Sequence, residues 1–294
     1  MTIGERIREL RVSKLMTQAE LAGDQITRNM LSYIENGSAN PSLSTILYIA
    51  ARLNVPAGFL LADEGDEIVY RKMSNLSNIK RAYTAGDLRG CRSLCMSACP
   101  DPDDEIYLLL ASCDVGIGVE EFWSGRLRSA CRYFDEALGY AEKTIYPTAT
   151  VEAEARVYFR YMERLSHTLY SDLLDEEAAC AVSSLSPFAA YVRALEALDA
   201  ENDGAVEEYL CGADENAFFA AHVRVRLLMK EGDYRTSGAA LLQMLHGDTP
   251  LNRIELYTVL YELEICCRET EDFKGAYNYA NEKIQLLEDL LKEY

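Results

Sequence analysis

Apolar residues recur at helical spacing along almost the whole chain, and this periodicity constrains the fold more than any other feature of the sequence. Near the N-terminus, Ile3, Ile7 and Leu10 are four and three residues apart, which places them on one side of a helix. Beyond about residue 68, no stretch of sequence alternates apolar and polar residues as a half-buried strand does. The sequence therefore predicts an all-α protein.

The first 62 residues carry start and stop signals for five short helices. Thr17 and Glu20 form a capping box that starts the second helix, and Gly23 lies in the turn that follows it. Thr27 is a natural N-cap for the third helix, which ends near Gly37 because glycine tolerates a left-handed conformation. Two short helices bracketed in this way are typical of a helix-turn-helix. The fourth helix is expected to bury Ile46, Leu47, Ala50 and Leu53, and Pro56 is expected to start the fifth.

Individual residues make this pattern specific. The region resembles the XRE-type, or lambda-repressor-like, helix-turn-helix family over residues 3–61. One departure is the turn between Ala22 and Thr27, which is one residue shorter than in phage repressors. The resemblance implies a five-helix domain whose third helix enters the major groove of DNA. The matching segments are Leu10-Arg11, Thr17-Gln18-Ala19-Glu20-Leu21-Ala22, Leu31-Ser32-Tyr33-Ile34-Glu35-Asn36-Gly37 and Asn40-Pro41-Ser42-Leu43.

The resemblance also implies which residues contact DNA. Arg28, Asn29 and Tyr33 match base-contacting positions, with Ser32 and Met30 beside them. Arginine pairs with guanine, asparagine pairs with adenine, and tyrosine packs on a thymine methyl or bonds a phosphate. The alternative for Arg28 and Asn29 is an ordinary solvated helix face. The same correspondence assigns Gln18, Thr27, Asn36 and Ser38 to the phosphate backbone, and Arg11 and Glu35 to a buried structural ion pair.

Charge divides the chain into two parts. Residues 1–62 carry six basic and five acidic residues, whereas the remainder carries 23 and 43. DNA would be repelled by the acidic remainder and tolerated by the first part. Arg6, Arg8 and Lys14 are expected to add non-specific attraction. A domain so close to neutral makes few phosphate contacts, so we expect a homodimer on double-stranded DNA with half-sites about 34 Å apart.

Residues 69–294, which follow a linker at 63–68, contain a weak internal repeat. Two of the intervals between its turns, Leu88 to Leu127 and Tyr234 to Phe273, are both 39 residues long. The pattern resembles degenerate tetratricopeptide (TPR) repeats, whose usual length is about 34 residues. We therefore expect about ten to thirteen helices stacked as a curved solenoid that supplies the dimer contact. The turns are Ala85-Gly86-Asp87-Leu88, Gly125-Arg126-Leu127, Glu231-Gly232-Asp233-Tyr234 and Thr270-Glu271-Asp272-Phe273.

A solenoid of this kind has a concave face lined by the first helix of each pair. Aromatic residues mixed with a few cations on that face suit a short peptide and its terminal carboxylate. The alternative is that these aromatics pack between helices. The residues expected in the groove are Tyr158, Tyr161, Phe219, His222, Arg226, Lys230, Tyr261 and Arg268, with Tyr191 and Met229 beside them.

A helix-turn-helix followed by a TPR-like solenoid resembles the RRNPP family of Gram-positive regulators in the order and length of its domains. This resemblance implies a dimeric transcriptional regulator that takes part in quorum sensing by binding a short secreted signal peptide in its solenoid. The residues leave one alternative open, a constitutive repressor whose solenoid only dimerises or docks a protein partner.

The remaining motifs predict no further chemistry. Nine scattered cysteines and three histidines give neither a disulfide framework nor a zinc site, and no cofactor is expected. Cys91, Cys95 and Cys99 share a helical face, where they pack as small apolar residues or, alternatively, sense redox state. Ser166-His167 near Asp172 is interpreted as a coincidence, so no enzyme activity is expected. No apolar run approaches the ~20 residues that cross a bilayer, which favours a cytoplasmic location.

Overall fold

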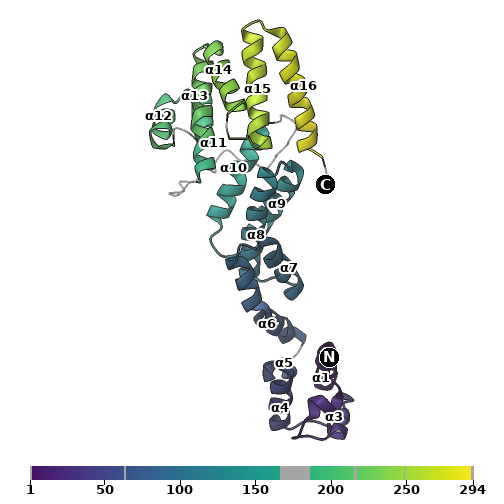
Figure 1. Ribbon diagram of the computed structural model, residues 1–294. Coiled ribbons are helices and arrows are strands. Elements are labelled where there is room, and N and C mark those ends of the chain that lie inside the picture. The colour runs from purple at the N-terminus through teal and green to yellow at the C-terminus, as the bar shows by residue number, and fades with distance from the viewer. Residues whose placement is uncertain (1, 63, 166–185, 215–216, 248, 293–294) are drawn as a thin grey trace. The chain divides into compact units, whose positions relative to one another are not determined.

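The computed structural model describes residues 2–62, 64–165, 186–214, 217–247 and 249–292. Within these residues the protein is all-α, with sixteen helices and no strand, which confirms the predicted fold class. The chain divides into two compact units, Met1–Ile106 and Tyr107–Tyr294. Figure 1 follows the chain through each unit.

Five short helices open the first unit, as the capping signals predicted. The first four begin at hydroxyl side chains, Thr2, Thr17, Thr27 and Ser42, each of which accepts a backbone N–H of the first turn. The fifth begins after Pro56. The five helices are α1 (Ile3–Ser13), α2 (Gln18–Ala22), α3 (Arg28–Glu35), α4 (Leu43–Leu53) and α5 (Ala57–Leu61).

These five helices enclose one apolar core. It contains side chains from every helix, and burial of this surface is the main force that holds such short helices in place. In α4, Ile46, Ala50 and Leu53 are buried as predicted and Ile49 joins them, whereas Leu47, predicted to be buried, is 53% exposed. The fully buried residues include Ile7, Leu21, Leu31, Ile49, Leu53 and Leu60.

Arg6 lies inside this domain and not on its surface. Its guanidinium donates hydrogen bonds to the carbonyl oxygens of Phe59 (3.0 Å) and Ala62 (2.5 Å), and it lies 5.6 Å from the centre of the Phe59 ring. Only 2% of the residue is exposed. The expectation that Arg6 attracts DNA is therefore wrong, because its charge serves to hold α1 against the end of α5.

Two longer helices complete the first unit, α6 (Glu64–Thr84) and α7 (Leu88–Ala98). The predicted linker at 63–68 falls on Asp63, which lies outside the described residues, and on the first turns of α6. Tyr70 of α6 packs edge-on against Phe59 at 6.0 Å, so α6 contacts the five-helix core. The two units are therefore divided at residues 106 and 107, inside the next helix, and not at the predicted linker.

The second unit is built from consecutive helices that pack against their neighbours (Figure 1). All four predicted turns separate consecutive helices, one in the first unit (Gly86) and three in the second (Gly125, Gly232 and Glu271), and each of these four residues has a positive φ. The assignment of these helix pairs to the TPR class stays a prediction. The helices are α8 (Asp104–Trp123), α9 (Leu127–Ala141), α10 (Ala149–Leu165), α11 (Pro187–Asp199), α12 (Asp203–Gly212), α13 (Phe218–Lys230), α14 (Tyr234–Leu245), α15 (Arg253–Glu269) and α16 (Phe273–Leu290).

A cluster of aromatic rings, in stacked, tilted and edge-on pairs, lies in the core of the second unit. Phe188 of α11 lies 4.7 Å from Tyr158 and 5.8 Å from Phe219, measured between ring centres. The end of α16 joins the same core, because Leu290 is fully buried and lies against Gly125 in the turn between α8 and α9. Such ring pairs add about 0.5–1.5 kcal/mol each beyond the area they bury.

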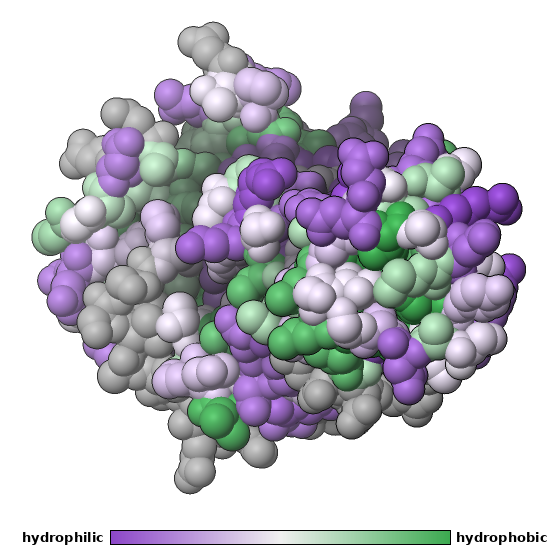
Figure 2. Space-filling view, turned by 90° about the horizontal axis from the view of Figure 1, so that it is seen from below, coloured by the Kyte–Doolittle hydropathy of each residue, from purple (hydrophilic) through white to green (hydrophobic). Residues whose placement is uncertain are grey.

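On the face seen in Figure 2, hydrophilic residues alternate with small apolar patches. Among the described residues, the exposed apolar side chains of the five-helix domain include Leu15, Leu43, Leu47 and Leu61. No helix in the described part of the chain combines the length and the apolar character needed to cross a membrane.

Candidate functional site

The turn between α2 and α3 is fixed by contacts from α4. The Tyr48 hydroxyl donates a hydrogen bond to the carbonyl oxygen of Ala22 (2.9 Å), and the Arg52 guanidinium bonds the carbonyl of Glu20. Gly23 has a φ of +55°, and a Cβ atom there would lie 2.3 Å from the Tyr48 hydroxyl oxygen. Only glycine therefore fits this turn, which sets the angle at which α3 leaves α2.

A buried carboxylate links α1, α2 and α3. Glu35 of α3 accepts hydrogen bonds from Arg11 at 2.6 and 3.0 Å and from the Gln18 side-chain amide at 2.8 Å. Arg11 also donates to the carbonyl oxygen of Met16 (2.9 Å). Burial raises the pKa of the Glu35 carboxyl, but the bonds from Arg11 and Gln18 outweigh this and hold the pKa below its ordinary value. The predicted ion pair of Arg11 and Glu35 is therefore part of a hydrogen-bond network that also includes Gln18.

The outward face of α3 carries the residues predicted to contact bases. Leu31, Ile34 and Glu35 are buried on the inner side of the helix. Arg28 and Asn29 are exposed, Tyr33 is 59% exposed, and Ser32 is half-buried between them; Met30 at the margin is 38% exposed. Because α3 is held on its inner side, its outer side chains project from a fixed frame.

The residues predicted to hold the phosphate backbone surround the two helices. Thr27 caps α3 by accepting the N–H of Met30 (3.1 Å), and Asn36 and Ser38 are exposed just beyond its C-terminus. Gln18 is half-buried, and its amide N–H₂ is engaged by Glu35. The structure thus gathers these residues at the α2–α3 region, with Gln18 fixed by the Glu35 network.

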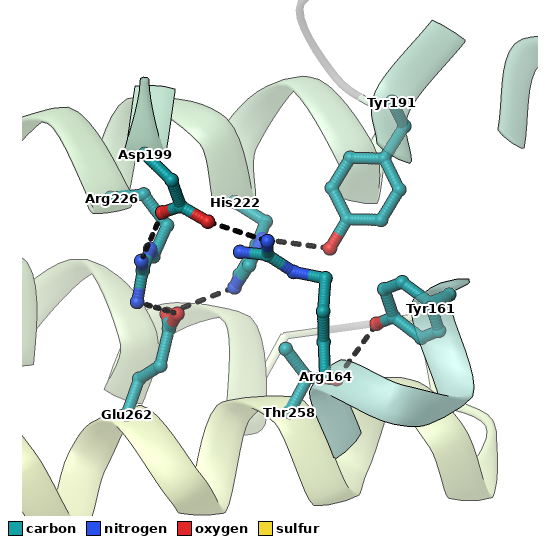
Figure 3. Close-up of polar contacts among 8 residues, drawn as sticks. All are labelled: Tyr161, Arg164, Tyr191, Asp199, His222, Arg226, Thr258 and Glu262. Atoms are coloured by element: carbon teal, nitrogen blue, oxygen red, sulfur yellow. Dashed lines mark hydrogen bonds and ion pairs between the residues drawn. The ribbon is translucent and has the colours of Figure 1, made fainter. Parts of the chain in front are cut away.

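A second candidate site is a pocket in the second unit. It has a volume of ≈ 260 Å³ and lies among α10, α11, α13 and α15. Figure 3 shows eight of its residues, with polar side chains from all four helices turned toward one another. The complete lining is Tyr161, Arg164, Leu165, Tyr191, Leu195, Asp199, His222, Arg226, Tyr257, Thr258, Tyr261 and Glu262.

Ion pairs cross one end of this pocket (Figure 3). Asp199 lies 2.5 Å from Arg164 and 3.3 Å from Arg226, and Arg226 also lies 3.4 Å from Glu262. Glu262 is 2.9 Å from the Nε2 atom of His222, and both side chains are almost completely buried. Each guanidinium in the pocket therefore has a carboxylate partner from another helix.

Tyrosines line the other end. The Tyr191 hydroxyl is 2.9 Å from the Nδ1 atom of His222, and the Tyr161 hydroxyl is 3.0 Å from the Thr258 hydroxyl. Burial raises the pKa of Tyr161 and raises that of Tyr191 well above its ordinary value, so both remain hydrogen-bond donors at neutral pH. The pocket thus combines neutral donors with paired charges.

The structure brings half of the predicted groove residues together. Tyr161, His222, Arg226 and Tyr261 line the pocket. Among the rest, Tyr158 and Phe219 pack in the aromatic core, because burying a large ring is more favourable than exposing it to water. Lys230 pairs with Asp203 at 2.9 Å, and Arg268 is 57% exposed near Glu269. These four residues do not line the pocket, and their place in a peptide groove stays a prediction.

Sequence reasoning missed Arg164, Asp199, Thr258 and Glu262. A signal for them existed, because Thr258 and Glu262 are four residues apart, as are His222 and Arg226 on α13. Side chains at this spacing share one helix face. Asp199 gave no such signal, because it is the last residue of α11 and reaches the pocket only through packing against α13.

The cysteine stripe that runs along α7 to Cys99 is buried. Cys91 and Cys95 are fully buried, and Cys99 is 2% exposed. Burial, followed by the neighbouring Cys91, raises the pKa of Cys95 to about 12. A redox role is therefore disfavoured against simple packing. No metal-binding group of three or more His, Cys, Asp or Glu residues occurs in the described parts of the chain, and Ser166, His167 and Asp172 lie outside them.

Comparison with known proteins defines the class of the first domain. Residues 7–60 match a family model described as helix-turn-helix, so this domain is a helix-turn-helix, as the sequence predicted. The immunity repressor protein of Bacillus phage phi105 is 35% identical over 65 residues. That match covers 22% of this chain and 45% of the repressor, so the chain spans less than half the length of this relative.

The crystal structure of Bacillus thuringiensis PlcR in complex with the peptide PapR7 and DNA matches 99% of this chain and 99% of PlcR, at 13% identity and a TM-score of 0.24.

Proposed function

We propose that this chain is a sequence-specific DNA-binding transcriptional regulator, with α3 as the helix that enters the major groove. The observation that carries the proposal is the outward face of α3, where Arg28, Asn29 and Tyr33 project from a helix fixed by the Glu35 network. Arginine and asparagine bond bidentately to guanine and adenine, and tyrosine suits a thymine methyl or a phosphate. Held on a rigid helix, these groups discriminate sequences without first having to be ordered.

The flanking polar residues suit backbone contacts. Asn36 and Ser38 are exposed at the C-terminal end of α3, and Thr27 lies at its N-terminal end, where unpaired N–H groups favour an anion. Gln18 is held by Glu35 through its N–H₂ group. Phosphate contacts of this kind fix the register of the protein on DNA but carry no sequence information.

We also propose that the regulator acts as a homodimer. The helix-turn-helix domain carries only one basic residue more than it has acids, and Arg6 is buried, so few cations remain for phosphates. One such domain binds weakly, because the affinity for DNA rises with the number of neutralised phosphates. Two copies on one duplex restore affinity and double the length of sequence that is read.

A binding-site selection with the full chain tests α3 as the DNA-contacting helix. Arg28→Ala is expected to lose selection at one base pair in each half-site, a discrimination of about 1–3 kcal/mol. Arg235→Ala, which removes an exposed arginine from α14 in the other unit, is the matched control and should keep the original preference. An unchanged preference for Arg28→Ala would remove this residue from the interface.

For the second unit we propose that the pocket binds a short signal peptide through its terminal carboxylate. Arg164 and Arg226 converge on Asp199 at one end, so a carboxylate that enters there competes with Asp199 for two guanidinium groups. Tyr161, Tyr191 and Tyr261 supply apolar surface and hydroxyl groups beside it. Aromatic walls with convergent cations are a recurring arrangement for capturing peptide termini.

The single tryptophan of the chain offers a readout for this pocket. Trp123 lies 5.1 Å from Phe188, whose ring lies 5.1 Å from Tyr161 of the pocket lining. We expect heptapeptides of randomised sequence with free C-termini to shift Trp123 fluorescence, and the same peptides with amidated C-termini to bind at least tenfold more weakly. Arg226→Gln should remove this difference, whereas Arg268→Gln, outside the pocket, should keep it.

The second candidate function is a constitutive repressor whose second unit only dimerises or docks a partner. The observation that favours it is that Arg164 and Arg226 already have carboxylate partners within the pocket, so neither guanidinium needs a ligand as its counter-ion. In this case no peptide changes Trp123 fluorescence or the affinity for the selected DNA site, while DNA binding itself is retained.

A further inference from the structure

A basic segment follows the helix-turn-helix domain within the same compact unit. Residues 68–98 carry six Lys or Arg and a single acid, whereas residues 99–294 carry 17 basic and 38 acidic residues. The one acid is Asp87, whose carboxylate is engaged as the N-cap of α7, where it accepts the N–H of Gly90 (2.9 Å). The segment is therefore an island of positive charge between the acidic stretch at 63–67, where α6 begins, and a strongly acidic second unit.

The composition of α6 is unusual beyond its charge. From Tyr70 to Thr84 it contains no acid, and nine of the fifteen residues are Lys, Arg, Ser, Thr or Asn. These are the side chains that supply most protein contacts to phosphate oxygens. Only Ile79 is buried in this stretch, at 1% exposure, so α6 packs along a narrow seam and presents most of its surface to solvent.

Individual cations of α6 differ in how they are used. Lys72 forms ion pairs with Asp103 (2.7 Å) and Glu105 (2.5 Å) and so stabilises the fold. Lys80 and Arg81 are exposed, and neither forms an ion pair with any residue that the structure describes. On a helix these two residues lie on the side opposite Ile79, together with Ser77 and Thr84.

We propose that the outer face of α6, centred on Lys80 and Arg81 with Ser77 and Thr84, is a second DNA-contacting surface that binds phosphates beyond those held by the helix-turn-helix. The partner follows from charge complementarity, because the helix-turn-helix domain brings a polyanion to the same compact unit but supplies few cations of its own. Arg71 and Arg89 are also exposed, and Arg92 is half-buried; all three extend the positive field of α6 and α7, which lie side by side in Figure 1. The contact is independent of base sequence, so it adds affinity and not specificity.

This inference rests on the proposed DNA binding, and the salt dependence of affinity tests it separately. The probe is a 40-base-pair duplex carrying the site selected by the full chain, titrated by fluorescence anisotropy at several salt concentrations. For Lys80→Gln with Arg81→Gln we expect the slope of log K against log salt to fall by up to about 0.9 for each cation removed, with affinity at least tenfold lower at low salt. The ratio of specific to non-specific affinity should stay unchanged.

Arg235→Gln with Lys274→Gln is the matched control, since it removes two exposed cations from α14 and α16 of the other unit. It should keep the original slope. An unchanged slope for the α6 variant would overturn the inference while leaving the proposed function intact, and failure of the unmodified chain to bind any duplex would overturn both. Loss of binding to anionic phosphatidylglycerol vesicles, without a change in the DNA slope, would reassign the α6 surface to a membrane and overturn the inference as stated.

Discussion

At the scale of single residues, the helix-turn-helix depends on a carboxylate that folding removes from water. Glu35 receives three hydrogen bonds, from Arg11 and Gln18, and its side chain is 1% exposed. Glu35→Gln should lower the free energy of unfolding of this domain by about 2 kcal/mol or more, because Arg11 loses its charged partner. Hydrogen exchange of the α1 and α3 amides in the full chain measures this loss. Glu9→Gln, an exposed change on α1, is the control and should have no effect.

The same carboxylate predicts an acid dependence. The pKa of Glu35 in the folded protein lies below its ordinary value of 4.5, so the group contributes stability that is fully present above pH 4.5. That contribution disappears as the pH falls through the folded pKa. We expect protection of α1 and α3 to fall on acidification below pH 4.5, and to fall less in Glu35→Gln. Equal acid dependence in both proteins would contradict this role.

Two tyrosines of the pocket provide a matched pair of substitutions. Tyr191→Phe removes the hydroxyl that contacts the Nδ1 atom of buried His222, leaving a ring nitrogen without this partner at a cost of about 1–3 kcal/mol. Tyr161→Phe should cost less, because Thr258 also donates to the carbonyl oxygen of Ile254 at 3.0 Å. Urea unfolding followed by Trp123 fluorescence reports on this unit. A larger loss of unfolding free energy for Tyr161→Phe than for Tyr191→Phe would contradict this prediction.

Residue-level prediction from the sequence succeeded where the signal was local. The spacing of Leu31 and Ile34 gave the inner side of α3, and the structure exposes Arg28 and Asn29 opposite to it. Leu47 shows the limit, since its hydropathy suggested burial although only the packing of α4 decides between it and Ile49. The burial of Arg6 depends on carbonyl groups more than fifty residues away, so no local pattern indicates it.

At the scale of elements, the turn between α2 and α3 gives a prediction with an internal control. Gly23→Ala combines a left-handed backbone, which costs about 1–2 kcal/mol, with a collision against the Tyr48 hydroxyl. Gly37 also has positive φ, but a Cβ atom there would meet nothing within 4 Å. Gly37→Ala should therefore lower the free energy of unfolding only by the cost of the left-handed backbone. Hydrogen exchange of α2 and α3 should rank the two variants, and equal destabilisation would show that Tyr48 moves aside freely.

Element boundaries were predictable where caps are local and unpredictable where packing decides. The boxes and caps at Thr17 and Thr27, and all four predicted helix-pair turns, coincide with helix ends. The acidic stretch before residue 69 suggested a linker, but α6 begins at Glu64 and packs through Tyr70 against Phe59. The pocket is built from polar side chains of four helices that are distant in sequence. Of the two pairs at a spacing of four residues, the sequence analysis named His222 with Arg226 and missed Thr258 with Glu262.

At the scale of the whole molecule, the distribution of charge frames the proposed function. The helix-turn-helix domain is near neutral, residues 68–98 are basic, and everything beyond residue 98 is strongly acidic. An acidic second unit is repelled by DNA, which keeps it free for a ligand or a partner. In the proposed function, binding then comes from the groups of the first unit, and the proposed homodimer supplies two sets of them.

A dimer of this kind makes the spacing of the DNA half-sites decisive. Two helix-turn-helix domains related by a two-fold axis enter successive major grooves when the half-sites are one helical turn, about 34 Å, apart. Inserting five base pairs between the half-sites moves one of them to the opposite face of the duplex. We expect this insertion to reduce affinity to that of a duplex with a single half-site, and a ten-base-pair insertion to recover part of the loss. Anisotropy titrations of the full chain on the three duplexes measure the effect, and equal affinity for all three would mean that each chain binds DNA alone.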